Sequence, residues 1–476
     1  MQTPIDIGSR RELFWDEYLI DTAQTTAQLR LHQPREREVV IDHDQPWEGD
    51  GCDFHNIMND DGLYRMYYLG WWTKVPGTDK HSPIVVCYAE STDGLTWTKP
   101  ELGLREHAGS TANNIILNNE DALFDNFFVF KDTNPDCPAD ERYKGVALDV
   151  RERGLWCFTS ADGIRFRKAW LLTTHGKFDT LNTALWDRHT GQYFCYLRDF
   201  HNVPDDDWNA GIRDVRWMVS RDFKEWTLPE LLDFGGAEDY PLYTNVIQPY
   251  YRADHVFVGF PSRYVEKKAW TPNFNQLSGP ERRRERMQMQ PRYGLTITDC
   301  VFMSSRDGRT WNRWDEAFMT PGPEHELNWV YGDCYPALGL IETPADRSGA
   351  PDELSFYAFD NHWAGIPAQL RRYTVRIDGF VSYHAPYQPC TVVTKPFIYD
   401  GQSLSVNFAT SARGYLLIKL IGGGTVLESC ELFGDSLDRR VPFENGEAAS
   451  LAGKPVVMEI TMRDADIYSF KFGGRE

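Results

Sequence analysis

A seven-residue phrase of the form Ser-x-Asp-Gly-x-x-aromatic recurs along the chain, and it restricts the fold more than any other feature. Its four copies begin at Ser91, Ser160, Ser220 and Ser305, so successive copies start 69, 60 and 85 residues apart. A degenerate fifth copy follows at Ile377-Asp378-Gly379-Phe380. The intervals exceed the roughly 40–50 residues of common propeller repeats. The repetition predicts a closed ring of similar sheets with long connections.

Each copy has the chemistry of a tight β-hairpin. Glycine accepts a positive φ and the aspartate side chain binds nearby backbone N–H groups, and Phe223 replaces the glycine in the third copy. The aromatic residue three positions after the glycine can fold back and bury its ring between neighbouring sheets. An apolar run precedes each copy, at 84–89, 155–159, 215–219 and 300–304. We therefore interpret the copies as the outer hairpins of propeller blades, with structural aspartates.

The sequence predicts an all-β protein: a five-bladed β-propeller at 1–385, followed by a small C-terminal β-sandwich at 386–476. The blades are expected at 45–105, 112–175, 178–233, 238–320 and 326–385. Within an N-terminal segment at 1–44, the run 11–20 is expected to close the ring by joining the last blade, which removes exposed sheet edges. Short apolar runs after Pro389, such as 404–408 and 415–420, indicate the sandwich.

Composition limits the classes of partner. A chain of 476 residues favours two domains, and aromatic residues at 14% suit a β-rich protein. The net charge of −20 argues against nucleic-acid or anionic-membrane partners. No run approaches the roughly 18 apolar residues of a membrane span, and no basic-then-apolar leader opens the sequence, so a cytoplasmic location is expected. The nine cysteines form no CxxC pair and are expected to be reduced.

Acidic residues stand near the start of every predicted blade. In a propeller the innermost strands begin at a central funnel, so these carboxylates are expected to share one pocket. Carboxylates that share a pocket cannot all ionise cheaply, so their pKa values separate. Glycoside hydrolysis needs such a division between an acid and a base or nucleophile. The candidate catalytic residues are Asp53, Asp125, Asp179 and Glu238, and Asp239 and Glu326 are expected to bind substrate.

Other polar and aromatic residues are candidates for substrate binding. An arginine at the end of an apolar strand could bind sugar hydroxyls or a substrate carboxylate, or it could pair with the funnel acids. Trp363 could stack on a sugar ring. The set comprises His55, Asn126, Asn182, Arg198, Asn245, Arg263, Asn328, His362 and Trp363.

An insertion at 266–292 interrupts blade 4 and carries the charged run Glu281-Arg282-Arg283-Arg284-Glu285-Arg286. Isolated charge runs are usually solvated, so a solvated loop is expected here rather than a lid or an anion site.

The repeats, the hairpins and the opening from Asp53 to Gly62-x-Tyr64-x-Met66-Tyr67 resemble the five-bladed propeller glycoside hydrolases of families 32, 43, 68 and 117. The phrase at 88–100 resembles the end of blade 1 in family-32-like proteins, and the resemblance spans 45–385. It implies that Asp53 is the nucleophile or base, that Asp125 orients or stabilises, and that Asp179 or Glu238 is the acid. It also implies a carbohydrate substrate.

The chain departs from that family pattern in three places. Blade 1 has no Asn-Asp-Pro, Arg198-Asp199-Phe200 replaces an Arg-Asp-Pro triplet, and no Glu-Cys pair occurs. We therefore expect a divergent, exo-acting glycosidase, with furanosides favoured, rather than an ordinary invertase.

Two alternatives stay open at the level of sequence. One is a carbohydrate-binding propeller without a catalytic carboxylate pair. The other is a sialidase-like hydrolase with a tyrosine nucleophile and an arginine triad drawn from Arg142, Arg198 and Arg263. No cofactor or metal site is expected, with a structural calcium ion left open because related propellers can hold one. A homo-oligomer formed through the sandwich is also left open.

Overall fold

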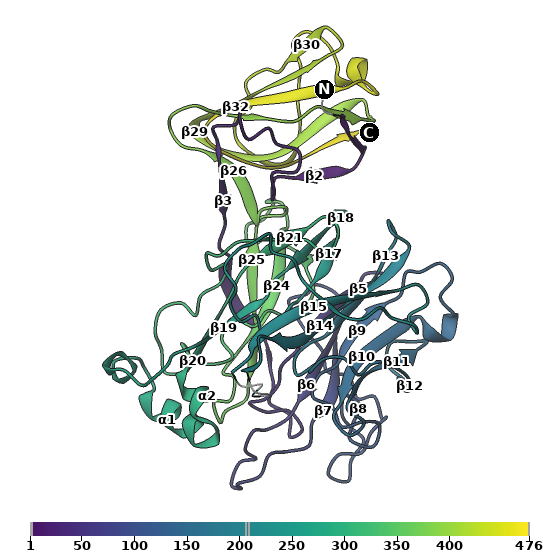
Figure 1. The fold of residues 1–476 in the computed structure, drawn as a ribbon, viewed down its shortest axis with the longest axis vertical. Coiled ribbons are helices and arrows are strands. Elements are labelled where there is room, and N and C mark those ends of the chain that lie inside the picture. The colour runs from purple at the N-terminus through teal and green to yellow at the C-terminus, as the bar shows by residue number, and fades with distance from the viewer. Residues whose placement is uncertain (1–2, 205–206, 208–209, 475–476) are drawn as a thin grey trace.

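The computed structural model describes residues 3–204, 207 and 210–474. They form a ring of sheets, drawn in the lower part of Figure 1, and a separate β-domain above it. The ring has five four-stranded sheets, which confirms the predicted five-bladed propeller.

Each blade is an antiparallel sheet, and its strands are named here from the innermost outward. Blade 1 comprises β5(Asn56–Asp60), β6(Leu63–Gly70), β7(Val85–Ser91) and β8(Ile115–Leu117). Blade 2 comprises β9(Phe128–Lys131), β10(Tyr143–Asp149), β11(Gly154–Ser160) and β12(Arg167–Thr173). Blade 3 comprises β13(Thr183–Asp187), β14(Gln192–His201), β15(Ile212–Ser220) and β16(Glu230–Leu231). Blade 4 comprises β17(Gln248–Tyr250), β18(Ala253–Gly259), β21(Met303–Ser305) and β22(Asn312–Arg313). Blade 5 comprises β23(Ile341–Thr343), β24(Glu353–Asp360), β25(Gln369–Val375) and, from far earlier in the chain, β4(Arg35–Asp42).

The ring closes through β4 and not through the run at 11–20. Strand β4 pairs antiparallel with β25, with Val39 opposite Arg371. The run at 11–20 instead begins with β2(Arg11–Leu13), which pairs with the last strand of the C-terminal sheet. The physical reason is burial: Phe14 and Leu19 pack into the core of the C-terminal domain, which the outer edge of a blade could not offer them.

The C-terminal domain takes strands from both ends of the chain. Its long strands β29(Ser403–Gly422) and β32(Val456–Gly473) pair along most of their length, with a register shift between Thr410 and Tyr415. The ten strands are connected by hydrogen bonds and surround a single apolar core. Residues 5–31 and 381–385 thus belong to this domain in addition to the expected 386–476. The other strands are β1(Ile5–Gly8), β2, β3(Gln28–Leu31), β26(Val381–Ala385), β27(Cys390–Val393), β28(Phe397–Tyr399), β30(Thr425–Glu428) and β31(Asp435–Arg440).

The repeated phrase forms the same hairpin in each copy. In the first copy, Oδ1 of Asp93 accepts hydrogen bonds from the backbone N–H groups of Leu95 and Thr96, both at 2.8 Å. The following Gly94 has a φ of 71°. Phe223, which replaces glycine in the third copy, adopts a φ of 64° and buries its ring completely. The aspartates of the phrase are therefore structural, as their sequence context indicates.

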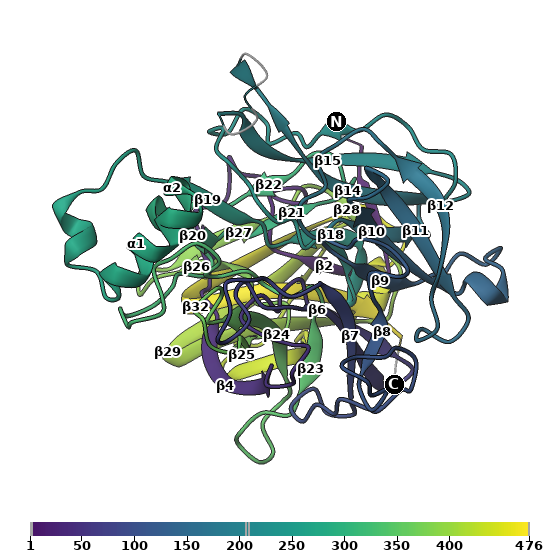
Figure 2. The same ribbon diagram turned by 90° about the horizontal axis from the view of Figure 1, so that it is seen from below.

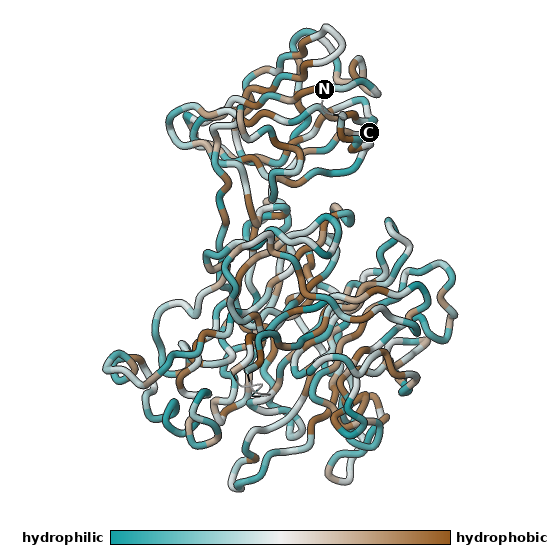
Figure 3. Tube along the Cα trace, viewed as in Figure 1, coloured by the Kyte–Doolittle hydropathy of each residue, from teal (hydrophilic) through white to brown (hydrophobic). Residues whose placement is uncertain are grey.

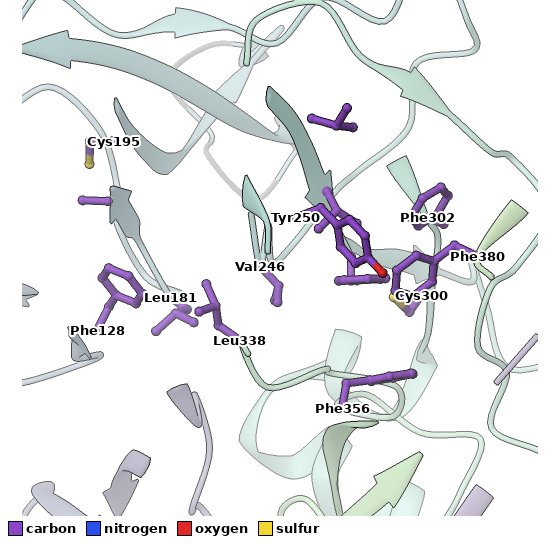
Figure 4. Close-up of a cluster of buried hydrophobic side chains, with 14 of the residues drawn as sticks. Phe128, Leu181, Cys195, Val246, Tyr250, Cys300, Phe302, Leu338, Phe356 and Phe380 are labelled. Carbon is purple, nitrogen blue, oxygen red and sulfur yellow. The ribbon is translucent and has the colours of Figure 1, made fainter. Parts of the chain in front are cut away.

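Apolar side chains fill the axis of the propeller. Leu181, Val246 and Leu338, from the segments that lead into the inner strands of blades 3, 4 and 5, belong to one buried cluster with Phe128 (Figure 4). The same cluster continues through Tyr250 to residues beside the C-terminal domain. Figure 3 shows the corresponding apolar stretches in the strands of both domains. The axis of the propeller is thus packed with apolar side chains.

The insertion in blade 4 is folded. It lies between β19(Ser262–Glu266) and β20(Thr296–Cys300) and contains η3(Pro272–Asn275), α1(Pro280–Met289) and α2(Pro291–Leu295). Figure 2 shows these two α-helices at the edge of the ring. The expected solvated loop is wrong, because Arg283 and Arg286 in the charged run are buried. Short helical turns also occur at η1(Ala139–Glu141) and η4(Ala448–Leu451), and no described helix has the length and hydropathy of a membrane span.

Candidate active site

Three of the predicted acids meet where the inner strands begin. Asp53, Asp125 and Asp179 lie in the loops that lead into β5, β9 and β13, on three consecutive blades. The charge of Asp125 acts on Asp53, and the charge of Asp179 acts on Asp125. Asp53 is only 6% exposed, whereas the side chain of Asp179 is 49% exposed. The cluster therefore runs from a buried carboxyl to one that solvent can reach.

The environment separates the proton affinities of these acids. Burial, and then the charge of Asp125, raise the pKa of Asp53 well above its ordinary 3.8. Burial and the charge of Asp179 raise the pKa of Asp125 to about 6, against an opposing effect of Arg198. Oδ1 of Asp53 is buried without a hydrogen-bond partner. Asp53 therefore binds its proton more tightly than an ordinary aspartate, and no neighbouring protein group bonds to Oδ1.

Arg198 joins the acids to an aromatic surface. This residue of β14 is 1% exposed, and its guanidinium forms an ion pair with Oδ1 of Asp179. The guanidinium carbon lies 4.6 Å from the ring centroid of Tyr243 and 4.7 Å from that of Phe200. Nε and Nη2 of Arg198 are buried without hydrogen-bond partners. Arg198 thus fixes Asp179 and keeps donors available for a further acceptor.

The predicted asparagines hold the loops that carry the acids. Nδ2 of Asn126 donates to the carbonyl of Phe178 at 2.6 Å, from blade 2 to blade 3. Nδ2 of Asn182 donates to the carbonyls of Phe178 and Thr180, at 2.9 and 2.8 Å. Asn245 bonds in the same way to the carbonyl of Leu181 at 3.1 Å. All three asparagines are buried, and their amides connect neighbouring segments of the propeller.

An aromatic wall faces the acids from blades 4 and 5. We define this wall as Tyr243, Tyr264, Tyr331, Tyr335 and Trp363. The hydroxyl of Tyr243 donates to the carbonyl of Asp179 at 3.2 Å, and the hydroxyl of Tyr331 donates to that of Tyr243 at 3.1 Å. The rings of Tyr331 and Trp363 lie 5.2 Å apart. Of these five residues the sequence predicts only Trp363, because no local pattern distinguishes the four tyrosines from the many other tyrosines of the chain.

Several buried polar atoms around the wall have no partner. They include the hydroxyls of Tyr264 and Tyr335, Nε1 of Trp363 and both ring nitrogens of His362. His362 stacks on Trp363 at 4.8 Å, and burial lowers its pKa well below the ordinary value. Buried polar atoms are satisfied in nearly all cases, so these atoms are available to a water molecule or a ligand.

The acids predicted for blades 4 and 5 lie outside the cluster. Glu238 is exposed, and its backbone carbonyl accepts a hydrogen bond from Arg313 at 2.5 Å. Asp239 pairs with Nε2 of His201 at 2.8 Å. The side chain of Glu326 is 70% exposed and lies 3.5 Å from Arg282. The structure does not bring these three residues to the carboxylates of blades 1 to 3.

Three other predicted residues already have protein partners. Nε2 of His55 lies 2.9 Å from Nε2 of His43, and Nδ2 of Asn328 donates to the carbonyls of Pro321 and Pro323 at 2.7 and 2.8 Å. Arg263 holds Asp299 with two bonds of 2.7 and 2.5 Å. Arg142 follows η1, beside the end of β9 that is remote from Asp125. Arg142, Arg198 and Arg263 therefore do not form a triad.

Helix α1 braces the aromatic wall. Nη1 of Arg283 donates to the carbonyl of Trp329 at 2.6 Å, and Nη1 of Arg286 donates to that of Tyr331 at 3.0 Å. Arg286 also donates to the carbonyl of His362. In α2, the ring of Tyr293 stacks on Tyr331 at 5.5 Å. Arginines can be buried here because backbone carbonyls of distant loops accept their protons.

No metal site is evident in residues 3–204, 207 and 210–474: no three His, Cys, Asp or Glu side chains among them are grouped to hold an ion.

No family model and no curated protein matches the chain. Similar solved structures include an N-acetylgalactosamine deacetylase from F. plautii in complex with blood group B trisaccharide, with a TM-score of 0.44, 11% identity, and coverage of 74% of this chain and 96% of that chain. A thermostable family-43 glycoside hydrolase gives a TM-score of 0.39 at 11% identity, over 70% of this chain and 92% of that chain. A fructofuranosidase from Schwanniomyces occidentalis complexed with fructosylnystose gives 0.37 at 11% identity, over 95% and 98%. Similarity at this level assigns no activity to this chain.

Proposed function

We propose that the chain is a glycoside hydrolase that removes a terminal sugar at Asp53, Asp125 and Asp179. One observation carries the proposal: three carboxylates from consecutive blades interact in sequence, the pKa values of Asp53 and Asp125 are raised, and Asp179 is ion-paired with the buried Arg198. That division is what glycosidic bond cleavage requires. Tyr243 and Trp363, the partly exposed members of the aromatic wall, support a carbohydrate ligand, because tyrosine and tryptophan rings bury the apolar faces of sugars.

The positions of the protons suggest roles for the acids. Asp53, whose pKa is raised well above the ordinary value, would donate a proton to the departing glycosidic oxygen. Asp179, paired with Arg198, would attack the anomeric carbon or activate a water molecule. Asp125 interacts with both, and its charge raises the pKa of Asp53. This assignment reverses the role that the family resemblance implies for Asp53, so the roles need a direct test.

The apolar filling of the axis supports exo action. Leu181, Val246 and Leu338 close the axis just beyond the acids, so a chain end enters more readily than the middle of a polymer. Furanosides are the substrates to try first, followed by pyranosides and oligosaccharides.

The experiment is a screen of the full chain against nitrophenyl glycosides and oligosaccharides, beside Asp53→Asn, Asp125→Asn and Asp179→Asn. Loss of a general acid or base costs about 10²–10⁴-fold in rate. Glu238→Gln is the matched control, since Glu238 is exposed and outside the cluster. If sugars bind but none is cleaved, the protein is a carbohydrate-binding propeller and the hydrolase proposal fails.

Two classes of substrate separate the acid from the nucleophile. A nitrophenyl leaving group departs without protonation, so the variant that lacks the acid should recover on nitrophenyl glycosides and stay slow on alkyl glycosides. The variant that lacks the nucleophile or base should be slow on both. Recovery by Asp179→Asn, with none by Asp53→Asn, would restore the roles that the family resemblance implies.

A further inference from the structure

Two buried arginines lie side by side next to the carboxylates. Arg213 of β15 pairs with Phe200 of β14, and Phe200 lies two residues after Arg198 in the same strand. The guanidinium carbon of Arg213 lies 5.4 Å from the Phe200 ring centroid, and that of Arg198 lies 4.7 Å from it. Arg213 also stacks on Tyr264 at 3.9 Å, and the ring of Tyr264 is 5.8 Å from that of Tyr243, on which Arg198 stacks. Two guanidinium groups thus cover two neighbouring tyrosines of the aromatic wall.

Arg213 is a buried cation without an assigned anion. It is 5% exposed, and its Nε has no hydrogen-bond partner. Burial, and then the positive charges of Arg198 and Arg292, lower the pKa of Arg213, and Tyr264 and Tyr243 act in the opposite direction. Arg198 has Asp179, but Arg213 has no comparable ion pair among the described residues. A buried charge without a counter-charge is costly, so the arrangement favours an anion that enters from outside.

Asp214, which follows Arg213 in the chain, and Asp239 of blade 4 have cations of their own. Asp214 binds Arg216 at 3.0 Å and lies 3.1 Å from Nδ1 of His201. Asp239, near the start of blade 4, pairs with Nε2 of the same histidine at 2.8 Å. Neither of these two carboxylates forms an ion pair with Arg213.

Resting on the proposed hydrolase function, we infer that Arg213, with the unpartnered Nε and Nη2 of Arg198, binds an oxyanion of the substrate sugar, a carboxylate or a sulfate. The planar guanidinium matches either group with paired hydrogen bonds. Because Nη1 of Arg198 binds Asp179, the oxyanion would lie next to the reacting carboxylate, on the same bound sugar. The substrate class is therefore an acidic sugar, such as a uronic acid or a sulfated sugar.

The first test uses the unmodified full chain and calorimetry. The probes are galacturonic and glucuronic acid, the neutral galactose and glucose, galactose 6-sulfate, and inorganic sulfate. Charged hydrogen bonds of this kind correspond to about 10–100-fold in affinity, so an acidic sugar should bind at least about tenfold more tightly than its neutral counterpart. The uronic acids and the sulfated sugar distinguish the two oxyanions, and inorganic sulfate shows whether the anion binds without a sugar. Equal affinity for acidic and neutral sugars, or no binding of acidic sugars, would overturn the inference.

The second test changes the arginine. Arg213→Gln should remove the preference for acidic sugars while the affinity for neutral sugars changes less than about threefold, and Arg213→Lys should retain part of the preference. Arg309→Gln removes the same charge from an exposed arginine that covers Trp217, and it should leave the preference intact. If Arg213→Gln does not fold, Arg213→Lys and the unmodified chain still decide the question. A preference that survives Arg213→Gln contradicts the assignment.

Failure of this inference can be told apart from failure of the hydrolase proposal. Acidic sugars that bind while no glycoside is cleaved would leave the oxyanion site standing and remove the hydrolase. Cleavage of neutral glycosides, with no preference for acidic ones in binding or rate, would leave the hydrolase proposal standing and remove the oxyanion site.

Discussion

Replacing Asp125 with asparagine should make the folded protein more stable at neutral pH. In the unfolded chain this carboxyl has its ordinary pKa of 3.8, whereas burial and the charge of Asp179 raise it to about 6 in the folded chain. The folded state therefore holds the proton more tightly. The contribution of this carboxyl to stability is fully present below pH 3.8 and is lost as the pH rises through 6. The asparagine side chain does not ionise, so the variant keeps this contribution to stability at neutral pH.

The two pKa values fix the size of the effect. Linkage gives a gain for Asp125→Asn of about 3 kcal/mol at pH 7.5 and about 1 kcal/mol at pH 4.5. Relief of Asp53 from the charge of Asp125 acts in the same direction. The measurement is the free energy of unfolding in urea at both pH values, for the unmodified chain and the variant.

A second aspartate supplies the control of opposite sign. Burial raises the pKa of Asp162, but hydrogen bonds from the backbone of Arg165 and Ile164 outweigh it and leave the pKa below the ordinary value. Asp162→Asn should therefore destabilise the protein by nearly the same amount at pH 7.5 and at pH 4.5, because both lie above the ordinary pKa of 3.8 and the stabilisation is lost only as the pH falls below it. If Asp125→Asn behaves like Asp162→Asn, or if its gain does not change with pH, the electrostatic description of the acidic cluster is wrong.

Three further outcomes follow from the packing. Glu238→Gln should change the rate on any substrate found by less than about threefold, because Glu238 is exposed. A loss of about 10²-fold, the scale expected when a catalytic acid or base is missing, would show that Glu238 belongs to the active site. Arg286→Ala leaves two buried carbonyls without a donor, so thermal or urea unfolding should show a loss of about 2–4 kcal/mol, and sugar binding should weaken with little change in kcat. The exposed Arg284→Ala is its control and should do neither. Phe223→Gly relieves a positive φ but empties a fully buried ring site, and we expect a net loss of about 2–4 kcal/mol, whereas a gain would mean that backbone strain dominates.

The sequence predicted the features that depend on local chemistry. The hairpin phrase indicated the blades because Ser-x-Asp-Gly determines its own turn. The sequence also indicated Asp53, Asp125 and Asp179, because each of them precedes a predicted inner strand. Glu238 satisfied the same pattern but lies elsewhere, since a loop of blade 4 turns it outward and no local signal marks that turn.

Features that depend on distant partners were missed. The run at 11–20 has the apolar residues of a strand, but nothing local says that Phe14 packs into the C-terminal core. The ring closes instead through the charged strand β4, whose apolar residues are few. The buried arginines of α1 look solvated in sequence, because the carbonyls of Trp329 and Tyr331 that accept their protons lie more than forty residues further along the chain.

The closure of the ring by β4 also has a consequence for biosynthesis. Residues 35–42 are made early, but their partner β25 spans Gln369–Val375, and the sheet that takes up β1, β2 and β3 is completed by the last strand of the chain. During vectorial synthesis blades 1 to 4 can form in order, while the early strand must wait for more than three hundred residues. Until then the open ring presents unpaired strand edges of the kind that aggregate or swap between chains. Yield in the cell should therefore depend on how nascent chains are protected late in synthesis, more than on the stability of any single blade.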